Sequence, residues 1–317
     1  KDNTNQINKP NIDFVLDAGK EIASVIKPGN LLILESTSPV GTTEKLSRIV
    51  SDYSGIDINK IKFAYCPERV IPGKILEELI WNNRIVGGLN KSSSIDCRKF
   101  YSTFCKGKIL TTNCRTAELV KLTENASRDV EIAFANELSL ICEELNVNVR
   151  ELIKLANYHP RVNLLQPGCG VGGHCIAVDP WFIASQLPKT TPLIQTARKI
   201  NDEKKNWVIN LIRKQSSTFE KETGRKPIIS CMGITFKPNV DDIRESPALF
   251  IANALIQSGA NIIVCEPNIS EYKSMKLSTI NKAVNNADLL VFLVAHDQFK
   301  SIKINNQKVI DICGVTQ

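Results

Sequence analysis

The strongest constraint on the fold is an alternation of short apolar runs with amphipathic segments, which occurs at both ends of the chain. In the first hundred or so residues, the apolar runs predict buried strands at 31–36, 61–68, 83–88 and 108–112. Segments with helical spacing lie between them, at 11–26, 39–50 and 92–104. Such alternation is typical of a parallel sheet whose crossover helices cover its faces.

The alternation stops near Thr116 and resumes near residue 228. Residues 116–146 contain no proline or glycine and predict one long helix, and more helical segments follow at 149–156, from about 180 and at 192–215. Strands return at 228–234, 261–267, 288–296 and 308–314, with a helix at 246–259. We therefore expect an α/β fold with an α/β domain at 1–115, a helical region at 116–218 and a second α/β domain at 219–317.

Composition and charge exclude several classes of protein. The 317 residues are 43% hydrophobic and 23% charged, and no apolar run approaches the roughly 18 residues that a membrane span needs. The first residues lack the apolar core of a signal peptide. The net charge of +7 is scattered singly rather than in basic blocks. We expect a globular protein that binds neither a membrane nor nucleic acid.

Cysteine usage indicates a reducing compartment. The ten cysteines include no CxxC pair, and the three histidines show no zinc-type spacing. A secreted disulfide scaffold would be shorter and built around its bridges. We expect a cytoplasmic protein with reduced thiols and no bound metal, in which most cysteines are small core residues.

One cysteine stands in a different setting, the glycine-rich stretch QPGCGVGGHCIAVDPWF at 166–182. The glycines before Cys175 allow a ligand to approach the backbone closely. A helix is expected from about Pro180, and a helix N-terminus favours the thiolate, so Cys175 could be a nucleophile. A buried thiol in a tight turn explains the pattern equally well. Asp179 before Pro180 is typical of a helix N-cap.

Other polar residues form two candidate binding patterns. Lys121, Asn125 and Arg128 follow i, i+4, i+7 spacing and share one helical face, which could surround an anionic or hydroxylated ligand, although most charged stripes are merely solvated. His159 and Arg161 flank a proline, which disfavours helix before it, so we expect an extended segment there.

A loop after the first strand of the second α/β part carries Phe236, Lys237 and Arg244. Loops at the carboxyl ends of parallel strands are where open α/β sheets bind ligands. Ser246 before Pro247 predicts the N-cap of the following helix, and a phosphate near that helix N-terminus is physically reasonable.

Five stretches of the chain, in the same order, resemble the UDP-glucose/GDP-mannose dehydrogenase family: 33–46, 65–74, 117–141, 159–183 and 233–248. The resemblance covers essentially the whole chain. It implies that the first domain is a Rossmann-like NAD-binding domain, that the central helices form a homodimer, and that the last domain is a Rossmann-like UDP-binding domain.

The resemblance also implies a reaction. The family oxidises a primary alcohol of a UDP-sugar to a carboxylate with two NAD+ molecules, through a covalent cysteine intermediate. The branch that this chain resembles acts on UDP-N-acetyl-D-mannosamine, and its product serves bacterial surface polysaccharides.

Roles follow for individual residues, again as what the resemblance implies. Cys175 would be the nucleophile, Lys121 the acid/base residue, and Asn125 would help to hold the reacting oxygen. Asp179 would assist the water or the thiol, and Glu68 would take part in water activation. Contacts with NAD would come from Thr37 and Arg244. The UDP-sugar site would be lined by Arg69, Val70, Arg128, His159, Arg161, Gly172, Phe236 and Lys237.

Two departures from the family pattern are visible. The family begins with a strand–turn–helix unit carrying GxGxxG and then an acidic residue, whereas the glycines near Gly87 and Gly170 lie in other contexts. About two strand–helix units of the NAD-binding domain are therefore expected to be missing from this sequence. Where the family usually keeps a basic residue near the substrate, this chain has Cys313, which should weaken binding by about 1–3 kcal/mol.

These departures leave two alternatives beside the dehydrogenase. The chain could be a non-catalytic UDP-sugar-binding remnant, which the absent cofactor motif favours. It could also oxidise another nucleotide sugar, such as UDP-N-acetylglucosamine. Retention of Cys175, Lys121, Asn125 and Asp179 favours an active enzyme.

Overall fold

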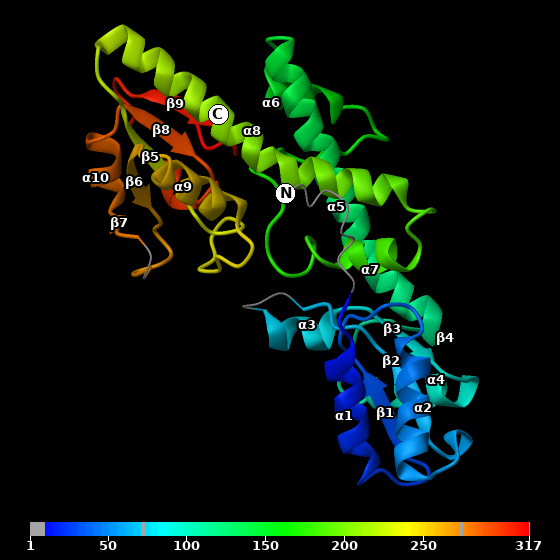
Figure 1. Ribbon diagram of the computed structural model, residues 1–317. Coiled ribbons are helices and arrows are strands. Elements are labelled where there is room, and N and C mark those ends of the chain that lie inside the picture. The colour runs from blue at the N-terminus through cyan, green and yellow to red at the C-terminus, as the bar shows by residue number, and fades with distance from the viewer. Residues whose placement is uncertain (1–9, 71–73, 273–274, 317) are drawn as a thin grey trace. The chain divides into compact units, whose positions relative to one another are not determined.

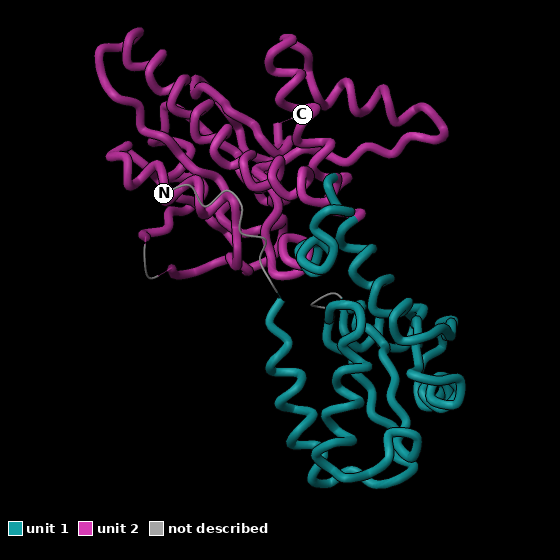
Figure 2. The backbone as a smooth tube through the Cα atoms, turned by 45° about the vertical axis from the view of Figure 1, so that its right-hand side comes forward, with its two compact units in different colours: residues 1–126, 179–192 teal, residues 127–178, 193–317 magenta. Residues whose placement is uncertain are grey.

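The computed structural model describes residues 10–70, 74–272 and 275–316. The chain divides into two compact units, which are coloured separately in Figure 2. Unit 1 consists of residues 1–126 and 179–192, and unit 2 of residues 127–178 and 193–317. No helix in the described ranges is long and apolar enough to cross a membrane. The predicted division into three domains at 115 and 218 stays a prediction.

Unit 1 contains the first α/β part (Figure 1). Its strands run in the order β1 (Leu31–Leu34), β2 (Lys62–Tyr65), β3 (Arg84–Gly88) and β4 (Ile109–Asn113). The helices of this part are α1 (Asp13–Ala23), α2 (Thr42–Ser54), α3 (Ile75–Trp81) and α4 (Lys91–Tyr101), with a 3-10 turn at Ile58–Lys60. Every strand predicted from an apolar run in this part is confirmed.

The sheet of unit 1 departs from the expected parallel arrangement at one place. Strand β3 runs antiparallel to β2, with Ala64 opposite Gly88 and Tyr65 opposite Gly87, whereas β1–β2 and β3–β4 are parallel. The expectation of a wholly parallel sheet was therefore wrong. An apolar run predicts that a strand forms but does not fix its direction, and helix α3 in the connection between β2 and β3 was not predicted.

Strand β2 shows how the sheet is buried on both faces. Phe63 and Tyr65 pack in one core with residues of α1 and α2, while Ala64 and Cys66 pack in a second core with residues of α4. Successive side chains of a strand point to opposite faces, so a strand covered on both sides must be apolar throughout. This is why the continuous apolar runs were informative.

The central helices are also as predicted. The long helix α5 (Cys114–Glu144) begins in unit 1 and continues into unit 2. Unit 2 then contains α6 (Val149–Ala156) and α8 (Pro192–Thr223), whereas α7 (Asp179–Gln186) belongs to unit 1. The absence of glycine and proline from α5 removes the usual interruptions of a long helix.

A buried polar network joins α5 to α8 within unit 2. The guanidinium of Arg198, whose side chain is 2% exposed, donates to Asp129 Oδ1 at 2.7 Å. Asn201 Nδ2 donates to the same oxygen at 2.8 Å, and Asn136 Nδ2 donates to Asn201 Oδ1 at 2.9 Å. Asn136 Oδ1 in turn accepts the Gly168 N–H at 3.0 Å. The network therefore anchors the start of the glycine-rich stretch.

The second sheet lies in unit 2 and is parallel throughout. Its order is β7 (Leu277–Ser278), β6 (Asn261–Cys265), β5 (Ile228–Met232), β8 (Leu289–Phe292) and β9 (Lys308–Asp311). The remaining elements are α9 (Pro247–Gln257), α10 (Ile280–Asn285) and a 3-10 turn at Asp297–Phe299. The four predicted strands and α9 are confirmed, while the short β7 and α10 were not predicted.

Helices cover both faces of this second sheet, and the start of α9 is capped by a side chain. Ile229 and Leu289 pack with α8 and α9, whereas Met232 and Phe292 pack with α10. The predicted N-cap of α9 is confirmed, because Ser246 Oγ accepts a hydrogen bond from the backbone N–H three residues on, at 3.2 Å.

We expect Arg198→Met to lower the free energy of unfolding by about 3–5 kcal/mol, because it leaves the buried Asp129 carboxylate without its cation. Arg115→Met is the matched control, since Arg115 pairs with Glu44 at 2.9 Å in an exposed position, and such pairs contribute about 0–1 kcal/mol. Urea denaturation of both variants measures the difference. Equal losses in the two variants would contradict a special role for the buried pair.

Candidate active site

The glycine-rich stretch places a cysteine at the surface. All ten cysteines lie in the described ranges, and Cys175 alone among them is exposed, while Cys313 is half-buried and the other eight are buried. A hydrogen bond from the Val178 N–H to the Cys175 carbonyl, at 3.1 Å, closes the turn. An exposed thiol does not fit the alternative of a buried structural cysteine. The geometry therefore favours a reactive role.

Glycines let this turn pack against the loop that follows β5. A Cβ on Gly172 would lie 2.6 Å from the Glu245 carbonyl oxygen and 2.8 Å from Phe236 Cβ. Gly173 has a φ of +78°, and its N–H donates to the Arg244 carbonyl at 3.0 Å. Close approach of two backbones thus requires glycine here. The sequence analysis had offered ligand access or a tight turn as reasons for the glycines and had not predicted this packing against a second loop.

The same loop brings a cation near the thiol. Arg244 Nε lies 3.0 Å from Asp242 Oδ1, and its Nη2 lies 2.6 Å from Asp242 Oδ2. These hydrogen bonds lower the pKa of Asp242 to about 2. The contact with Asp242 and, to a smaller extent, the Cys175 thiol raise the pKa of the Arg244 guanidinium. A cation close to a cysteine favours the nucleophilic thiolate.

Three of the predicted catalytic residues meet in unit 1. Lys121 and Asn125 lie one turn apart on α5 and are half-buried. Asp179 is buried and begins α7 rather than preceding it, and its Oδ2 accepts a hydrogen bond from Asn125 Nδ2. This bond brings the carboxylate onto the face of α5 that carries the lysine.

The loop after β2 carries Glu68, Arg69 and Val70. Glu68 Oε1 accepts the backbone N–H groups of Arg69, at 2.6 Å, and Val70, at 3.1 Å. The Arg69 guanidinium forms an ion pair with Glu124 of α5. Because Glu124 directly precedes Asn125, the pair ties this loop to the helix that carries the predicted acid/base residue.

The predicted NAD contact Thr37 is half-buried in the loop between β1 and α2. Glu118 of α5, which the sequence analysis missed, holds this loop: its Oε2 accepts the Gly41 N–H at 2.6 Å and its Oε1 accepts the Thr43 N–H at 2.7 Å. Burial raises the pKa of Glu118. The loop lies at the carboxyl end of a parallel strand, where such sheets bind dinucleotides, so the position of Thr37 fits a contact with NAD.

Three predicted substrate residues are exposed and make only local contacts in the described ranges. Arg128 pairs with Glu131 at 3.8 Å, and His159 Nδ1 accepts the Arg161 N–H at 3.3 Å. The expectation of an extended segment here was wrong. The Val162 N–H donates to the His159 carbonyl at 3.0 Å, which forms a turn with proline at its favoured second position.

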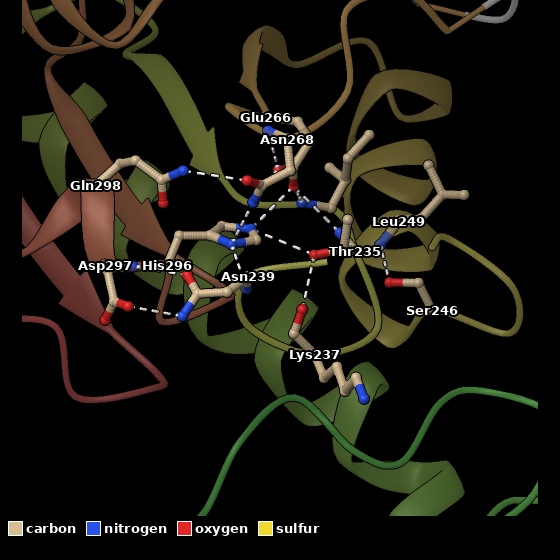
Figure 3. Close-up of polar contacts among 11 residues, drawn as sticks. Thr235, Lys237, Asn239, Ser246, Leu249, Glu266, Asn268, His296, Asp297 and Gln298 are labelled. Atoms are coloured by element: carbon tan, nitrogen blue, oxygen red, sulfur yellow. Dashed lines mark hydrogen bonds and ion pairs between the residues drawn. The ribbon is translucent and has the colours of Figure 1, made fainter. Parts of the chain in front are cut away.

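A buried polar network that the sequence analysis missed contacts Thr235 and Asn239, which lie on either side of Phe236 and Lys237 in the chain (Figure 3). Glu266 follows β6 directly, and His296 lies four residues after β8; the two are 3% and 0% exposed. His296 Nε2 lies 3.1 Å from Glu266 Oε2. Polar residues at the carboxyl ends of two parallel strands were the available signal.

A positive charge does lie near Cys313, although the basic residue usual at this position of the family is absent. Arg150 Nη2 donates to the Ile312 carbonyl at 2.9 Å, and its guanidinium is part of the electrostatic surroundings of the Cys313 thiol. Burial, the larger effect, raises the pKa of Cys313 well above its usual range.

The three parts of the chain match three domains of one family. Residues 2–105 match the NAD binding domain of the UDP-glucose/GDP-mannose dehydrogenase family, 115–203 match its central domain, and 230–317 match its UDP binding domain. The chain belongs to the UDP-glucose/GDP-mannose dehydrogenase family. It is an enzyme of this family of NAD-dependent UDP-sugar dehydrogenases, and the resemblance, the α/β fold and the cofactor are confirmed.

Individual members of the UDP-glucose/GDP-mannose dehydrogenase family are close in sequence. The chain is 47% identical over 321 residues to a UDP-N-acetyl-D-mannosamine dehydrogenase of Campylobacter jejuni, which covers 96% of this chain and 77% of the relative. It is 44% identical over 323 residues to an NDP-N-acetyl-D-galactosaminuronic acid dehydrogenase of Ralstonia solanacearum, covering 97% and 75%. The solved UDP-D-ManNAc dehydrogenase of Pyrococcus horikoshii matches with a TM-score of 0.88 and 36% identity, over 97% of this chain and 74% of that one.

Membership of the UDP-glucose/GDP-mannose dehydrogenase family does not by itself assign the residues. The roles predicted for the site residues, the homodimer and the cytoplasmic location stay predictions.

We expect Arg244→Gln to slow alkylation of Cys175 by iodoacetamide at pH 7 several-fold, because the cation that favours the thiolate is removed. Arg213→Gln, at an exposed position of α8, is the matched control. Peptide mass spectrometry at successive times measures the rate at Cys175 separately from the other cysteines. An unchanged rate would show that the guanidinium does not activate this thiol.

Proposed function

We propose that the protein oxidises the C6 alcohol of UDP-N-acetyl-D-mannosamine to the carboxylate, giving UDP-N-acetyl-D-mannosaminuronate. The observation that carries the proposal is the exposed thiol of Cys175, set in a glycine turn that is hydrogen-bonded to the loop of Arg244. The substrate is supported by 47% identity to the Campylobacter jejuni enzyme over 96% of this chain. The proposed use of the product in surface polysaccharide synthesis follows from the resemblance of the sequence alone.

The chemistry requires a covalent intermediate. Alcohol, two NAD+ and one water become carboxylate, two NADH and three protons, and NAD+ bound in turn for each oxidation would supply one hydride acceptor per step. Cys175 attacks the C6 aldehyde and forms a C–S bond, so the aldehyde is not released. After the second oxidation the intermediate is a thioester, and water then breaks its C–S bond to give the carboxylate and the thiol.

Proton transfer is assigned to residues of α5, α7 and the loop after β2. Lys121 takes the proton of the C6 hydroxyl as the alcohol is oxidised and stabilises the oxygen that develops negative charge. Asn125, hydrogen-bonded to Asp179, is held so that it can support the same oxygen. Asp179 and Glu68 are the carboxylates assigned to the water that hydrolyses the thioester.

The nucleotide sugar is assigned to side chains from several loops and from α5. Phe236 and Lys237 follow β5, and the Lys237 ammonium lies 5.5 Å from the centroid of the Phe236 ring, which places a cation and an aromatic face together. A ring and a cation suit a base and a diphosphate respectively. Arg69, Val70, Arg128, His159, Arg161 and Gly172 complete the assignment, and Thr37 and Arg244 are assigned to NAD.

A second candidate is oxidation of a different N-acetylated nucleotide sugar. The 44% identity to the Ralstonia solanacearum NDP-N-acetyl-D-galactosaminuronic acid dehydrogenase favours it almost as strongly. Turnover of UDP-N-acetylmannosamine, UDP-N-acetylgalactosamine and UDP-N-acetylglucosamine, compared by kcat/KM, decides between them.

We propose that the protein forms a homodimer through the central helices. Sedimentation of the protein in solution tests this oligomeric state.

With UDP-N-acetyl-D-mannosamine as substrate, we expect two NADH to form for each sugar consumed. Cys175→Ala should abolish uronate formation, because no C–S bond can form. Absorbance at 340 nm and chromatography of the sugar product measure the two quantities. One NADH per sugar, or uronate formed by Cys175→Ala, would refute the covalent route.

We expect Lys121→Met to reduce kcat by about 10²–10⁴-fold, which is the usual contribution of a general acid–base group. Lys199→Met is the control, because Lys199 is an exposed helical lysine paired only loosely with Glu203, at 4.0 Å. Steady-state kinetics at saturating sugar and NAD+ give kcat. If Lys121→Met kept full activity, the assignment of the acid/base residue would be wrong.

A further inference from the structure

The loop between Ile234 and Ser246 is attached to the sheet at its beginning by two buried side chains. Glu266 stands at the carboxyl end of β6 and His296 shortly after β8, on the two strands that flank β5. Both side chains are buried, and no role in the reaction has been given to either. Both side chains contact the segment that carries Phe236 and Lys237, through Thr235 and Asn239, and both also contact Asn268 (Figure 3).

The hydrogen bonds of His296 determine its tautomer. Its Nδ1 faces two donors, the Asn239 N–H at 3.0 Å and Asn268 Nδ2 at 2.8 Å, so Nδ1 must be the acceptor. The ring proton is therefore on Nε2, which donates to Glu266 Oε2 at 3.1 Å and lies 3.2 Å from Thr235 Oγ1. The Thr235 hydroxyl in turn donates a hydrogen bond to the Lys237 carbonyl at 3.0 Å, which connects His296 to the backbone of Lys237.

Glu266 is an acceptor on both oxygens. Its Oε2 accepts the backbone N–H groups of Ile234, at 2.8 Å, and Thr235, at 3.3 Å, in addition to the His296 ring. Its Oε1 accepts the Asn268 N–H at 3.0 Å. Burial opposes ionisation, but these hydrogen bonds outweigh it and lower the pKa of Glu266. A charged, fully hydrogen-bonded carboxylate of this kind is rigid.

The far side of the segment is fixed as well. Asn239 has a φ of +59°, a left-handed conformation that asparagine tolerates better than most residues. Its side chain donates to Asp297 Oδ2 at 2.8 Å, and its Oδ1 accepts the Asp297 N–H at 3.0 Å. Backbone groups on both sides of Phe236 and Lys237 are thus tied to the network.

We propose that Glu266 and His296 are positioning residues for nucleotide-sugar binding, which hold the Phe236–Lys237 segment in the conformation that receives the ligand. The inference rests on the proposed function, because it takes Phe236 and Lys237 as the side chains that contact the ligand. A binding segment that is already ordered loses less conformational entropy when the ligand binds. Loosening the network should therefore weaken binding while the chemical step, which other residues carry, continues.

His296→Gln distinguishes the contribution of the Nδ1 hydrogen bonds from that of the Nε2 hydrogen bond. The glutamine amide reaches the place of Nε2 and can still donate to Glu266, but it leaves the Asn239 N–H without its acceptor. His296→Asn is the conservative rescue, since its Oδ1 lies near the place of Nδ1 and can accept that N–H. Lys300→Gln is the control, because Lys300 makes an exposed ion pair with Asp297 next to the network.

We expect His296→Gln to raise the KM for the UDP-sugar and the dissociation constant of UDP roughly tenfold, with kcat within about twofold of the wild type. His296→Asn should show a smaller rise, and Lys300→Gln none. Hydrogen exchange of peptides covering 235–241 should become faster in His296→Gln. Unchanged UDP affinity and exchange, or a fall in kcat and melting temperature alone, would overturn the proposal and leave the pair a purely structural role.

The outcomes also separate this proposal from the proposed function. If the wild type oxidises no UDP-sugar, yet UDP binding weakens and exchange quickens in His296→Gln, the function is wrong and the positioning stands. If the wild type is active and His296→Gln changes neither UDP affinity nor exchange, the positioning alone is wrong.

Should His296→Gln fail to fold, Thr235→Val provides the test. It keeps the shape of a buried side chain and removes the hydroxyl that contacts both His296 Nε2 and the Lys237 carbonyl, so it should raise the same KM and leave kcat unchanged.

Discussion

The hydrogen bond from the Gly173 N–H to the Arg244 carbonyl is the contact on which the proposed role of Cys175 depends. It holds the turn of Cys175 against the loop after β5. The approach needs glycine at both positions, because a side chain on Gly172 would meet the Glu245 carbonyl and Gly173 has a left-handed φ of +78°. The same approach brings the Arg244 guanidinium within electrostatic range of the thiol. This backbone contact therefore affects both the exposure and the electrostatic surroundings of Cys175, the proposed nucleophile.

Buried polar side chains support the loops that carry the predicted site. Asn136 holds the start of the glycine-rich stretch, Glu118 holds the loop of Thr37, and Glu266 holds the segment of Phe236. A buried polar group is costly unless its hydrogen bonds are made, so each of these side chains strongly favours one loop conformation. Rigid elements thus position loops whose own sequences are rich in glycine and proline.

Most of the fold could be predicted from the sequence, because strands such as β2 and β8 are buried on both faces and therefore appear as continuous apolar runs. The direction of β3 and the short elements α3, β7 and α10 could not, since a strand pattern carries no direction and a helix of six or seven residues has little periodicity to detect. The candidate site was found largely through motifs. Glu118 and His296 were missed because only their hydrogen-bond partners identify them, and these partners are distant in the chain. Thr43 lies 75 residues from Glu118, and Glu266 lies 30 residues from His296.

The central claim is that Cys175 carries the sugar during the oxidation, and trapping that bond tests it most directly. The protein is mixed with UDP-N-acetyl-D-mannosamine and NAD+, quenched in acid within one turnover, digested and examined by mass spectrometry. We predict that the peptide containing Cys175 gains the mass of the sugar nucleotide acyl group, and that the gain disappears as the uronate accumulates. Uronate formation with the Cys175 peptide unmodified throughout, or an adduct on another side chain, would contradict the account.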